Sequence, residues 1–313
     1  MEQLLQELRS FLDAEVPRFR EKWGDDAGSW EARCAWQRTT AGGKWPAPAW
    51  SEEHGGRGAC VATLASDDVH GARTTVSDDA AGGRLSGAKT HVLDAHIADV
   101  LLVTAVRGER VQVFAVDPRA EGVELRPLTV LDRTRKQYRV ELTDVKGQLL
   151  DKDFGAGLSL TLYVAAVLAC AELLGVAGRC LETAVEYALD REQFGRPIDG
   201  FQAVKHLLAD SLVAVEQMRA AVGGAAEIAE GVVSARGRDG ADLAEVASVV
   251  KAHCSKAAPG TAETLVQVLG GIGFTWEHPA HLYLRRAKTL EVLYGNATEH
   301  RAWLARALEL VPA

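Results

Sequence analysis

The sequence lacks the patterns that mark several common kinds of site. Its five cysteines are widely spaced and form no CxxC pair, which argues against a disulfide framework or a structural zinc site. No HExxH motif indicates a catalytic metal, and no GxSxG elbow indicates a nucleophilic serine. We therefore expect no metal site, and the cysteine usage predicts a reducing, cytoplasmic location.

Positive charge and long apolar runs are also scarce. Lysine and arginine number 35 against 43 aspartates and glutamates, a net charge of −8, so nucleic acid or an anionic membrane is not an expected partner. The adjacent Arg285 and Arg286 are expected to be solvated. Residues 154–178 are long enough to span a bilayer and carry only Glu172 as a charge. Because they are rich in alanine and glycine and continue as a charged helix, they predict a buried bundle helix instead.

The chain falls into three stretches of different pattern. Residues 1–69 predict short helices and a loop rich in glycine, proline and tryptophan. Residues 70–150 contain short β-branched runs separated by Gly, Asp or Pro, which predicts a central antiparallel β-barrel or sandwich. Residues 151–313 are helical in pattern and predict a C-terminal four-helix bundle, so the expected fold class is α+β and multi-domain. The long helices are expected at about 156–190, 200–231, 240–268 and 280–310.

One distinctive segment, YALDREQFGRPIDGFQ, joins two of the predicted helices. One helix ends near Arg191, Phe194 and Gly195 form an apolar turn, and the next helix begins near Gln202. A guanidinium in such a place can bind a phosphate in bidentate fashion. The same residues also suit a plain helix–helix turn with a surface arginine, and taken alone they leave both interpretations open.

A second segment, QVLGGIGFTWEHP, places three glycines directly after a helix. They would let the backbone approach a ligand closely, and Gln267 lies one turn earlier. The segment follows a helix rather than a strand and lacks the GxGxxG spacing, so it does not predict a Rossmann site. A glycine stop at the end of a helix is the alternative interpretation.

Taken together, these segments resemble the acyl-CoA dehydrogenase family. The resemblance rests on EYALDREQFGRPIDGFQAVKHLLAD, QVLGGIGFTWEHPAHLYLRRAK and LYGNATEHRAWLAR, and the helix–β–helix order is similar. It implies oxidation of the Cα–Cβ bond of an acyl-CoA thioester by FAD, with a glutamate removing the α proton. It also implies that the flavin ring lies on one subunit while the adenosine diphosphate reaches the helical domain of its neighbour.

The resemblance implies that the groups holding the adenosine diphosphate are present in this chain. Arg191 and Gln193 match the residues that hold the pyrophosphate, and Phe194 matches the aromatic residue of the turn. Gln202 matches the glutamine that opens the next helix. The segment from Gln267 to Gly271 matches the family's glutamine and glycine strip along the adenosine. The implied FAD-binding residues are Arg191, Gln193, Phe194, Gln202, Gln267, Leu269, Gly270 and Gly271.

The catalytic base departs from the family pattern. Tyr294 stands where the family's glutamate precedes a glycine near the C-terminus, and Ala165 stands at the alternative base position on the first long helix. A phenol, with a reference pKa near 10, is a poor base for an α proton. We therefore expect no catalytic residue in this chain.

The flavin-facing segments of the β domain differ too. His91-Val92-Leu93 replaces the family's Trp-Ile-Thr, and Thr63-Leu64-Ala65 stands in place of its Thr-Glu-Pro loop. Strands are expected to begin near residue 70, so the N-terminal helical domain is expected to be truncated, which would leave space for a bulky acyl group.

These departures predict the non-catalytic small subunit of an α2β2 heterotetramer. Its larger catalytic partner would share the FAD and hold most of the acyl-CoA substrate. Analogy within the family suggests a steroid-derived acyl group and an electron-transferring flavoprotein as electron acceptor. Two alternatives stay open: a self-sufficient dehydrogenase that uses Glu172 or Glu299 as its base, and a scaffold that binds no flavin.

Overall fold

The computed structural model describes residues 14–15, 17–18, 21–22, 62–66, 74–77, 83–151, 155–234 and 240–310. The chain forms two compact units. The sheet unit comprises residues 1–108, 113–128 and 137–150, and the helical unit comprises residues 109–112, 129–136 and 151–313. Most of the predicted N-terminal helical piece and its loop, at residues 1–61, lies outside the described residues.

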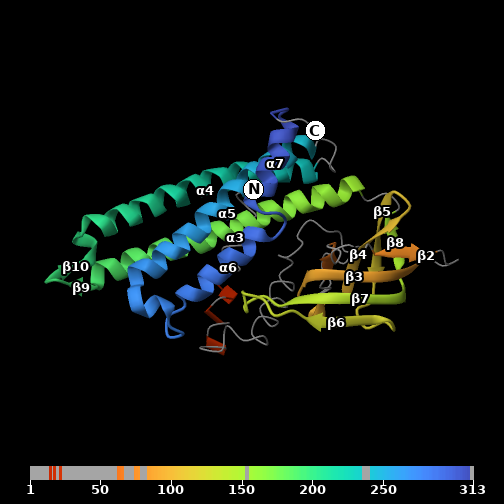
Figure 1. Cartoon of the computed structure of the whole chain (residues 1–313), viewed down its shortest axis with the longest axis horizontal. Helices are drawn as coiled ribbons and strands as arrows, with labels where there is room; N and C mark the ends of the chain where they lie inside the picture. Colours follow the sequence, from red (N-terminus) through yellow and green to blue (C-terminus); the bar gives the residue numbers. More distant parts are fainter. Residues whose placement is uncertain are drawn as a thin grey trace. The chain divides into compact units, whose positions relative to one another are not determined.

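The sheet unit is built on one eight-stranded sheet, drawn from orange to yellow-green in Figure 1. Its strands follow the order β6-β7-β3-β2-β4-β5-β8, and β1 pairs with β4 beside that path. A short 3-10 helix, η3 (Ala95–Ile97), follows β3. The strands are β1 (Ala62–Ala65), β2 (Thr75–Ser77), β3 (Arg84–Leu93), β4 (Val100–Arg107), β5 (Arg110–Val116), β6 (Val123–Pro127), β7 (Gln137–Lys146) and β8 (Gln148–Asp151).

The sheet is mixed and does not close among the described strands, so the predicted antiparallel barrel is wrong. β1 runs parallel to β4, with Ala62 opposite Val100, and β2 also pairs with β4 in parallel. The path of described strands runs from β6 to β8 without closing. Alternating apolar residues indicate which side of a strand is buried, but they do not specify its neighbour or its direction. The sequence also missed β1, which precedes residue 70.

The inner side of this sheet forms its own core. Leu85, Leu101, Val103 and Phe114 are fully buried there. Lys89 is also buried, at 1% exposure, and its ammonium donates to the carbonyl of Ser66 at 3.2 Å. A buried cation needs such acceptors, because an unpaired one would be costly.

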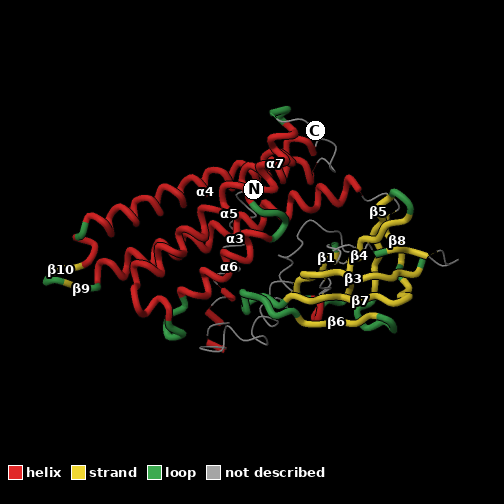
Figure 2. The backbone as a smooth tube through the Cα atoms, in the orientation of Figure 1, coloured by secondary structure: helices red, strands yellow, loops and turns green. Residues whose placement is uncertain are grey.

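The helical unit is a bundle around a central helix, α5, shown in red in Figure 2. α5 packs against the four other long helices. A small β9–β10 hairpin joins α3 to η4 and α4, and η5 follows α5. The elements are α3 (Gly155–Asp190), β9 (Glu192–Gln193), β10 (Arg196–Pro197), η4 (Ile198–Gly200), α4 (Gln202–Ser234), α5 (Gly240–Leu269), η5 (Gly270–Phe274), α6 (Ala280–Val292) and α7 (Ala297–Ala307).

Helix α3 contains the apolar run noted in the sequence. Its segment Gly157–Asp190 is long and apolar enough to cross a membrane by length and composition, and it is the one such helix in the described part of the chain. Leu173, Ala177 and Cys180 are fully buried where α3 packs in the bundle core. This one-sided burial is the pattern of a bundle helix.

The predicted last helix, 280–310, is in fact two helices. α6 ends at Val292, and Tyr294 and Gly295 have φ values of 60° and 94° before α7 begins. Asn296 caps α7: its side chain accepts from the backbone of Glu299, whose carboxylate accepts from the backbone of Asn296. This capping box and the left-handed glycine explain the break, and both can be recognised in the sequence Gly-Asn-Ala-Thr-Glu.

Candidate nucleotide-binding end of the bundle

A tight hairpin presents Phe194 at the end of α3. Arg196 pairs with Gln193 across the hairpin, and Phe194 and Gly195 at its tip have φ values of 53° and 77°. The Phe194 side chain is 92% exposed and packs edge-on against Phe201, with ring centroids 6.1 Å apart. An almost fully exposed phenylalanine on an ordered turn is available for contact with a ligand or another chain.

Arg191 lies at the base of this hairpin with a fixed backbone and an exposed side chain. Its amide donates to the carbonyl of Tyr187 at 2.9 Å, and its own carbonyl accepts from Ile198 at 2.8 Å. Within the described residues its guanidinium has no ion-pair partner. Gln193 is exposed and donates to the carbonyl of Glu192 at 2.6 Å, and Gln202 is exposed at the start of α4.

The glycine strip begins where α5 ends. Gly270 has a φ of 64°, and a Cβ added at Gly270 or Gly271 would meet no atom within 4 Å, so this backbone is open. Gln267 is exposed one turn earlier. Leu269 is only 4% exposed because its side chain belongs to the bundle core, so only its backbone can face a ligand.

The hairpin and the glycine strip lie at the same end of the bundle, on the left of Figure 1. α3 and α5 pack against each other and both end there. An exposed guanidinium, an open glycine backbone and exposed glutamines fit a diphosphate and its adenosine. That these eight residues hold the adenosine diphosphate part of FAD stays a prediction, to which the buried Leu269 could contribute backbone atoms only.

The loop that carries Tyr294 is held from beneath by Lys251. Lys251 is fully buried, and its ammonium donates to the carbonyls of Leu290 and Glu291 at 2.9 and 3.0 Å and to the hydroxyl of Ser255 at 2.8 Å. It thus satisfies two carbonyls at the end of α6 that have no helical partner. Burial lowers the pKa of Lys251 to about 8.

His300 holds the same loop from α7. Its Nε2 lies 3.0 Å from the carbonyl oxygen of Tyr294, and its Nδ1 lies 3.0 Å from the hydroxyl of Ser248. Because a carbonyl only accepts, Nε2 carries the proton. Burial is the main cause that lowers the pKa of His300. Sequence analysis missed this support, although Ser248, Lys251 and Ser255 are polar residues at helical spacing within an apolar helix.

That Tyr294 and Ala165 stand at the two base positions stays a prediction, and the two carboxylates considered as alternative bases have structural partners. Glu299 accepts from the backbone amide of Asn296 at 2.8 Å and so completes the cap of α7. Glu172 on α3 forms ion pairs with two arginines. Each of these two acids therefore has a structural partner.

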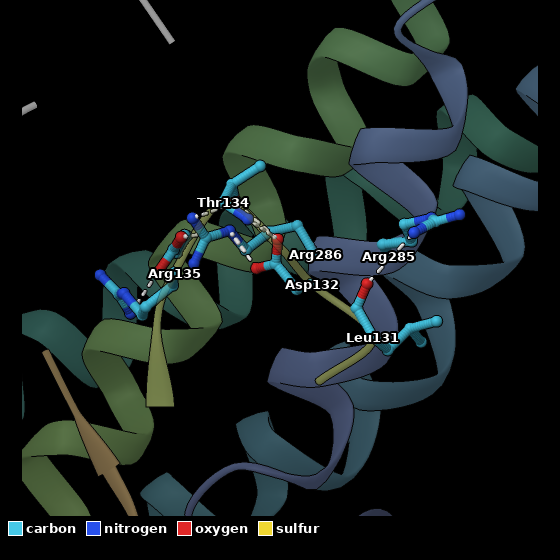
Figure 3. A network of polar contacts seen from close by, with 7 residues as sticks. Leu131, Asp132, Thr134, Arg135, Arg285 and Arg286 are labelled. Carbon is cyan, nitrogen blue, oxygen red and sulfur yellow. Dashed lines mark hydrogen bonds and ion pairs between the residues drawn. The ribbon is translucent and has the colours of Figure 1, made fainter. Parts of the chain in front are cut away.

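The Glu172 pairs belong to a polar network that Figure 3 shows around Arg286. Arg286 is 18% exposed and pairs with the buried Asp132 at 3.1 Å and with Glu172 at 3.4 Å. It also donates to the Thr134 hydroxyl at 2.7 Å, and Arg135 pairs with Glu172 at 3.5 Å. The expectation that Arg286 is solvated is wrong, because Asp132 lies more than 150 positions earlier in the chain and its approach depends on tertiary folding.

The structure brings together the two β-domain segments that depart from the family. The Thr63 hydroxyl donates to the carbonyl of Leu93 at 2.7 Å. His91 has a φ of 54°, and its Nδ1 lies 2.8 Å from Oε1 of Gln137. Val92 is 1% exposed and belongs to the sheet core, so its side chain offers no surface to a ring.

Comparison with known proteins shows what the helical unit resembles. The family model "Acyl-CoA dehydrogenase, C-terminal domain" matches residues 158–309. Acyl-CoA dehydrogenase FadE34 of Mycobacterium tuberculosis is 41% identical over 198 residues, which cover 63% of this chain and 26% of that protein. Acyl-CoA dehydrogenase IpdE2 of the same organism is 34% identical over 216 residues, which cover 69% and 59%.

A solved structure agrees with these matches. The ChsE4-ChsE5 complex from Mycobacterium tuberculosis contains a chain that is 29% identical, with a TM-score of 0.71 over 82% of this chain and 69% of that one. Of the two relatives above, the chain spans about a quarter of FadE34 and 59% of IpdE2. Members of this family bind FAD. Over residues 158–309, this chain is similar to the C-terminal domain of the acyl-CoA dehydrogenase family.

Proposed function

We propose that this chain is the non-catalytic small subunit of an α2β2 FAD-dependent acyl-CoA dehydrogenase. One contrast supports the proposal: the Gly270–Gly271 backbone expected to hold a nucleotide is open, whereas Glu172 and Glu299, the two acids considered as bases, both have structural partners. A chain that can hold the tail of a dinucleotide but offers no α-proton base needs a second chain for the chemistry. The similarity to a chain of the ChsE4-ChsE5 complex supports a heteromeric assembly.

Each exposed group at this end has a distinct part in binding. The Arg191 guanidinium would form charge-assisted hydrogen bonds to a phosphate, and the Gln193 and Gln267 side chains would bind further oxygens. Gly270 and Gly271 would let the adenosine approach the backbone, and Phe194 would shield it from water. When bound, FAD supplies the hydride acceptor of the reaction.

The partner would provide what this chain lacks. We propose that a larger catalytic subunit holds the flavin ring, the glutamate base and most of the acyl-CoA thioester. By analogy within the family, the acyl group is steroid-derived, an electron-transferring flavoprotein takes the electrons, and the complex is cytoplasmic.

Flavin content of the complex tests the role of Arg191. The chain is co-expressed with the product of the adjacent reading frame as the candidate catalytic subunit, and FAD per complex is measured by absorbance at about 450 nm. Arg191→Ala removes a charge-assisted bond to phosphate, so we expect FAD affinity to fall about tenfold or more. The control Arg219→Ala replaces an arginine of α4 that is paired with Glu216 and should keep full occupancy.

The same complex separates the alternatives. Unchanged flavin content in Arg191→Ala would favour the flavin-free scaffold. For the self-sufficient enzyme, turnover is compared in Glu172→Gln and Glu299→Gln complexes. The proposal predicts wild-type rates in correctly assembled samples, and a loss of about a hundredfold or more in either would identify a base in this chain.

A further inference from the structure

Trp276 is the centre of an exposed cluster in the helical unit that the nucleotide-binding end does not use. Its side chain is 68% exposed. The guanidinium carbon of Arg285 lies 5.1 Å from the centre of the indole ring, and that of Arg133 lies 5.9 Å from it. His281 packs edge-on against the same ring at 4.4 Å. We call Arg133, Trp276 and Arg285 the tryptophan–arginine clamp.

The clamp brings together three parts of the chain. Arg133 comes from the segment 129–136, which lies between β6 and β7 in sequence and belongs to the helical unit. Trp276 follows η5, and Arg285 is on α6. In Figure 3, Arg285 extends away from the Arg286 network and toward the backbone of Leu131, whose carbonyl accepts from it at 3.5 Å. The Arg286 network fixes the segment that carries Arg133.

The two clamp arginines are not neutralised by carboxylates in the described part of the chain. Neither Arg133 nor Arg285 takes part in an ion pair there, whereas the adjacent Arg286 has two. The chain as a whole carries a net charge of −8, so this unbalanced positive charge is a local exception. An arginine stacked on an aromatic ring keeps its in-plane N–H groups for a carboxylate or phosphate.

The charge of Arg285 contributes to a lowered pKa of the neighbouring His281. Burial lowers the pKa of His281 first, and the charge of Arg285 and the nearby His278 lower it further. The lowered pKa of His281 is consistent with the guanidinium group of Arg285 beside it, which forms no ion pair within the described residues.

Apolar side chains extend the clamp along the same turn. Phe274 is 80% exposed and Ile272 is 39% exposed. Exposed aromatic and aliphatic side chains beside arginine are typical of the centre of a protein–protein interface, where tryptophan and arginine contribute most of the binding energy. Guanidinium groups already lie over the indole ring, which argues against a stacked aromatic ligand.

We propose that the tryptophan–arginine clamp docks on an acidic surface of the catalytic subunit, whose aspartate or glutamate carboxylates bind Arg133 and Arg285. The inference rests on the proposed function. The catalytic subunit is the expected partner because of where the clamp lies. Gly270 and Gly271, which would face the FAD held by that subunit, precede Trp276 by only a few residues. The negative charge of that partner follows from the two guanidinium groups, which form no ion pair within the described residues and would attract a surface of the opposite sign.

Affinity between the two full-length chains tests this proposal. The dissociation constant is measured by calorimetry with the candidate catalytic subunit, the chain that forms the complex on co-expression, as the probe. Removing two central arginines in Arg133→Ala/Arg285→Ala, or the indole in Trp276→Ala, should raise it at least about 30-fold. The wild-type affinity should fall as salt rises from about 0.1 M to about 0.5 M, and the double variant should lose most of that dependence.

Two further variants make the outcome decisive. Arg219→Ala is the control for removing an exposed arginine and should bind like the wild type. Arg133→Lys/Arg285→Lys keeps the charge but not the bidentate geometry, and should bind with intermediate affinity and melt at the wild-type temperature. A double alanine variant that folds and binds within about threefold of wild type, with unchanged salt dependence, overturns the clamp. If that complex also keeps its FAD, the subunit proposal stands; if the wild type forms no complex, both fail.

Discussion

Lys251 shows how a single buried residue shapes the loop at the base position. Its three ammonium protons meet three acceptors, two of them carbonyls at the end of α6. Lys251→Met fills a similar space but leaves these carbonyls without a donor, so we expect a loss of about 3 kcal/mol in unfolding free energy by urea titration. Lys205→Met, at an exposed position of α4, is the control and should change stability by less than about 0.5 kcal/mol. Equal losses of unfolding free energy in the two variants would show that Lys251 does not stabilise this loop.

His300 makes the stability of the helical unit depend on pH. Its pKa is lowered in the folded chain, so between that value and the unfolded value near 6.5 the unfolded chain binds more protons. Stability should therefore be complete above about pH 6.5 and decline as the pH falls through the folded pKa. Urea titrations between pH 7.5 and 5 should show a flatter pH dependence for His300→Gln than for wild type, and parallel curves would contradict the assignment.

At the scale of elements, the break between α6 and α7 depends on Gly295. Its φ is 94°, and a Cβ there would come within 2.9 Å of Nε2 of His300, which binds the Tyr294 carbonyl. Gly295→Ala should therefore destabilise the chain by more than about 1 kcal/mol, measured by thermal unfolding.

The matched control for this substitution lies in α4. A Cβ at Gly223 would meet no atom within 4 Å in a regular helix. Gly223→Ala should leave stability unchanged or raise it by up to about 1 kcal/mol. The account of the break is wrong if Gly295→Ala is tolerated as well as Gly223→Ala.

The elements differ in how far their sequences determine them. The predicted helix 156–190 agrees with α3 at Gly155–Asp190, because a long run of apolar periodicity specifies a helix on its own. The parallel pairing of β1 with β4 was not predicted, because a strand's partner is chosen by tertiary packing. For the same reason, the contact between Arg133 and the ring of Trp276 could not be predicted from sequence.

The candidate site was predictable to the extent that it is local. Arg191, Phe194 and the glycines 270 and 271 lie in contiguous motifs, and the structure places both motifs at one end of the bundle. The contacts that hold the Tyr294 loop could not be predicted from sequence, because Lys251 and His300 lie on different helices and meet the loop only in the folded chain. Only the folded chain shows that Glu172 is held by Arg286 and is thus a poor candidate for a base.

At the scale of the whole molecule, the proposed function divides the work between two chains: this one would bind part of the cofactor and its partner would supply the base. Such a division of labour predicts that Tyr294→Phe in the assembled complex keeps the wild-type rate of thioester oxidation, because the phenol hydroxyl takes no part as a base. The measurement is steady-state turnover with an artificial electron acceptor. A rate loss of about a hundredfold or more, with FAD content unchanged, would assign a catalytic role to Tyr294.

The flavin stoichiometry of the purified chain, alone and with its catalytic partner, tests the central claim most directly. Absorbance at about 450 nm and native mass together give the number of FAD molecules per chain. The account predicts a nearly colourless chain alone and one FAD for each pair of unlike chains in the complex. A lone chain that purifies with a full complement of FAD, and that reduces this FAD when an acyl-CoA thioester is added, would contradict it.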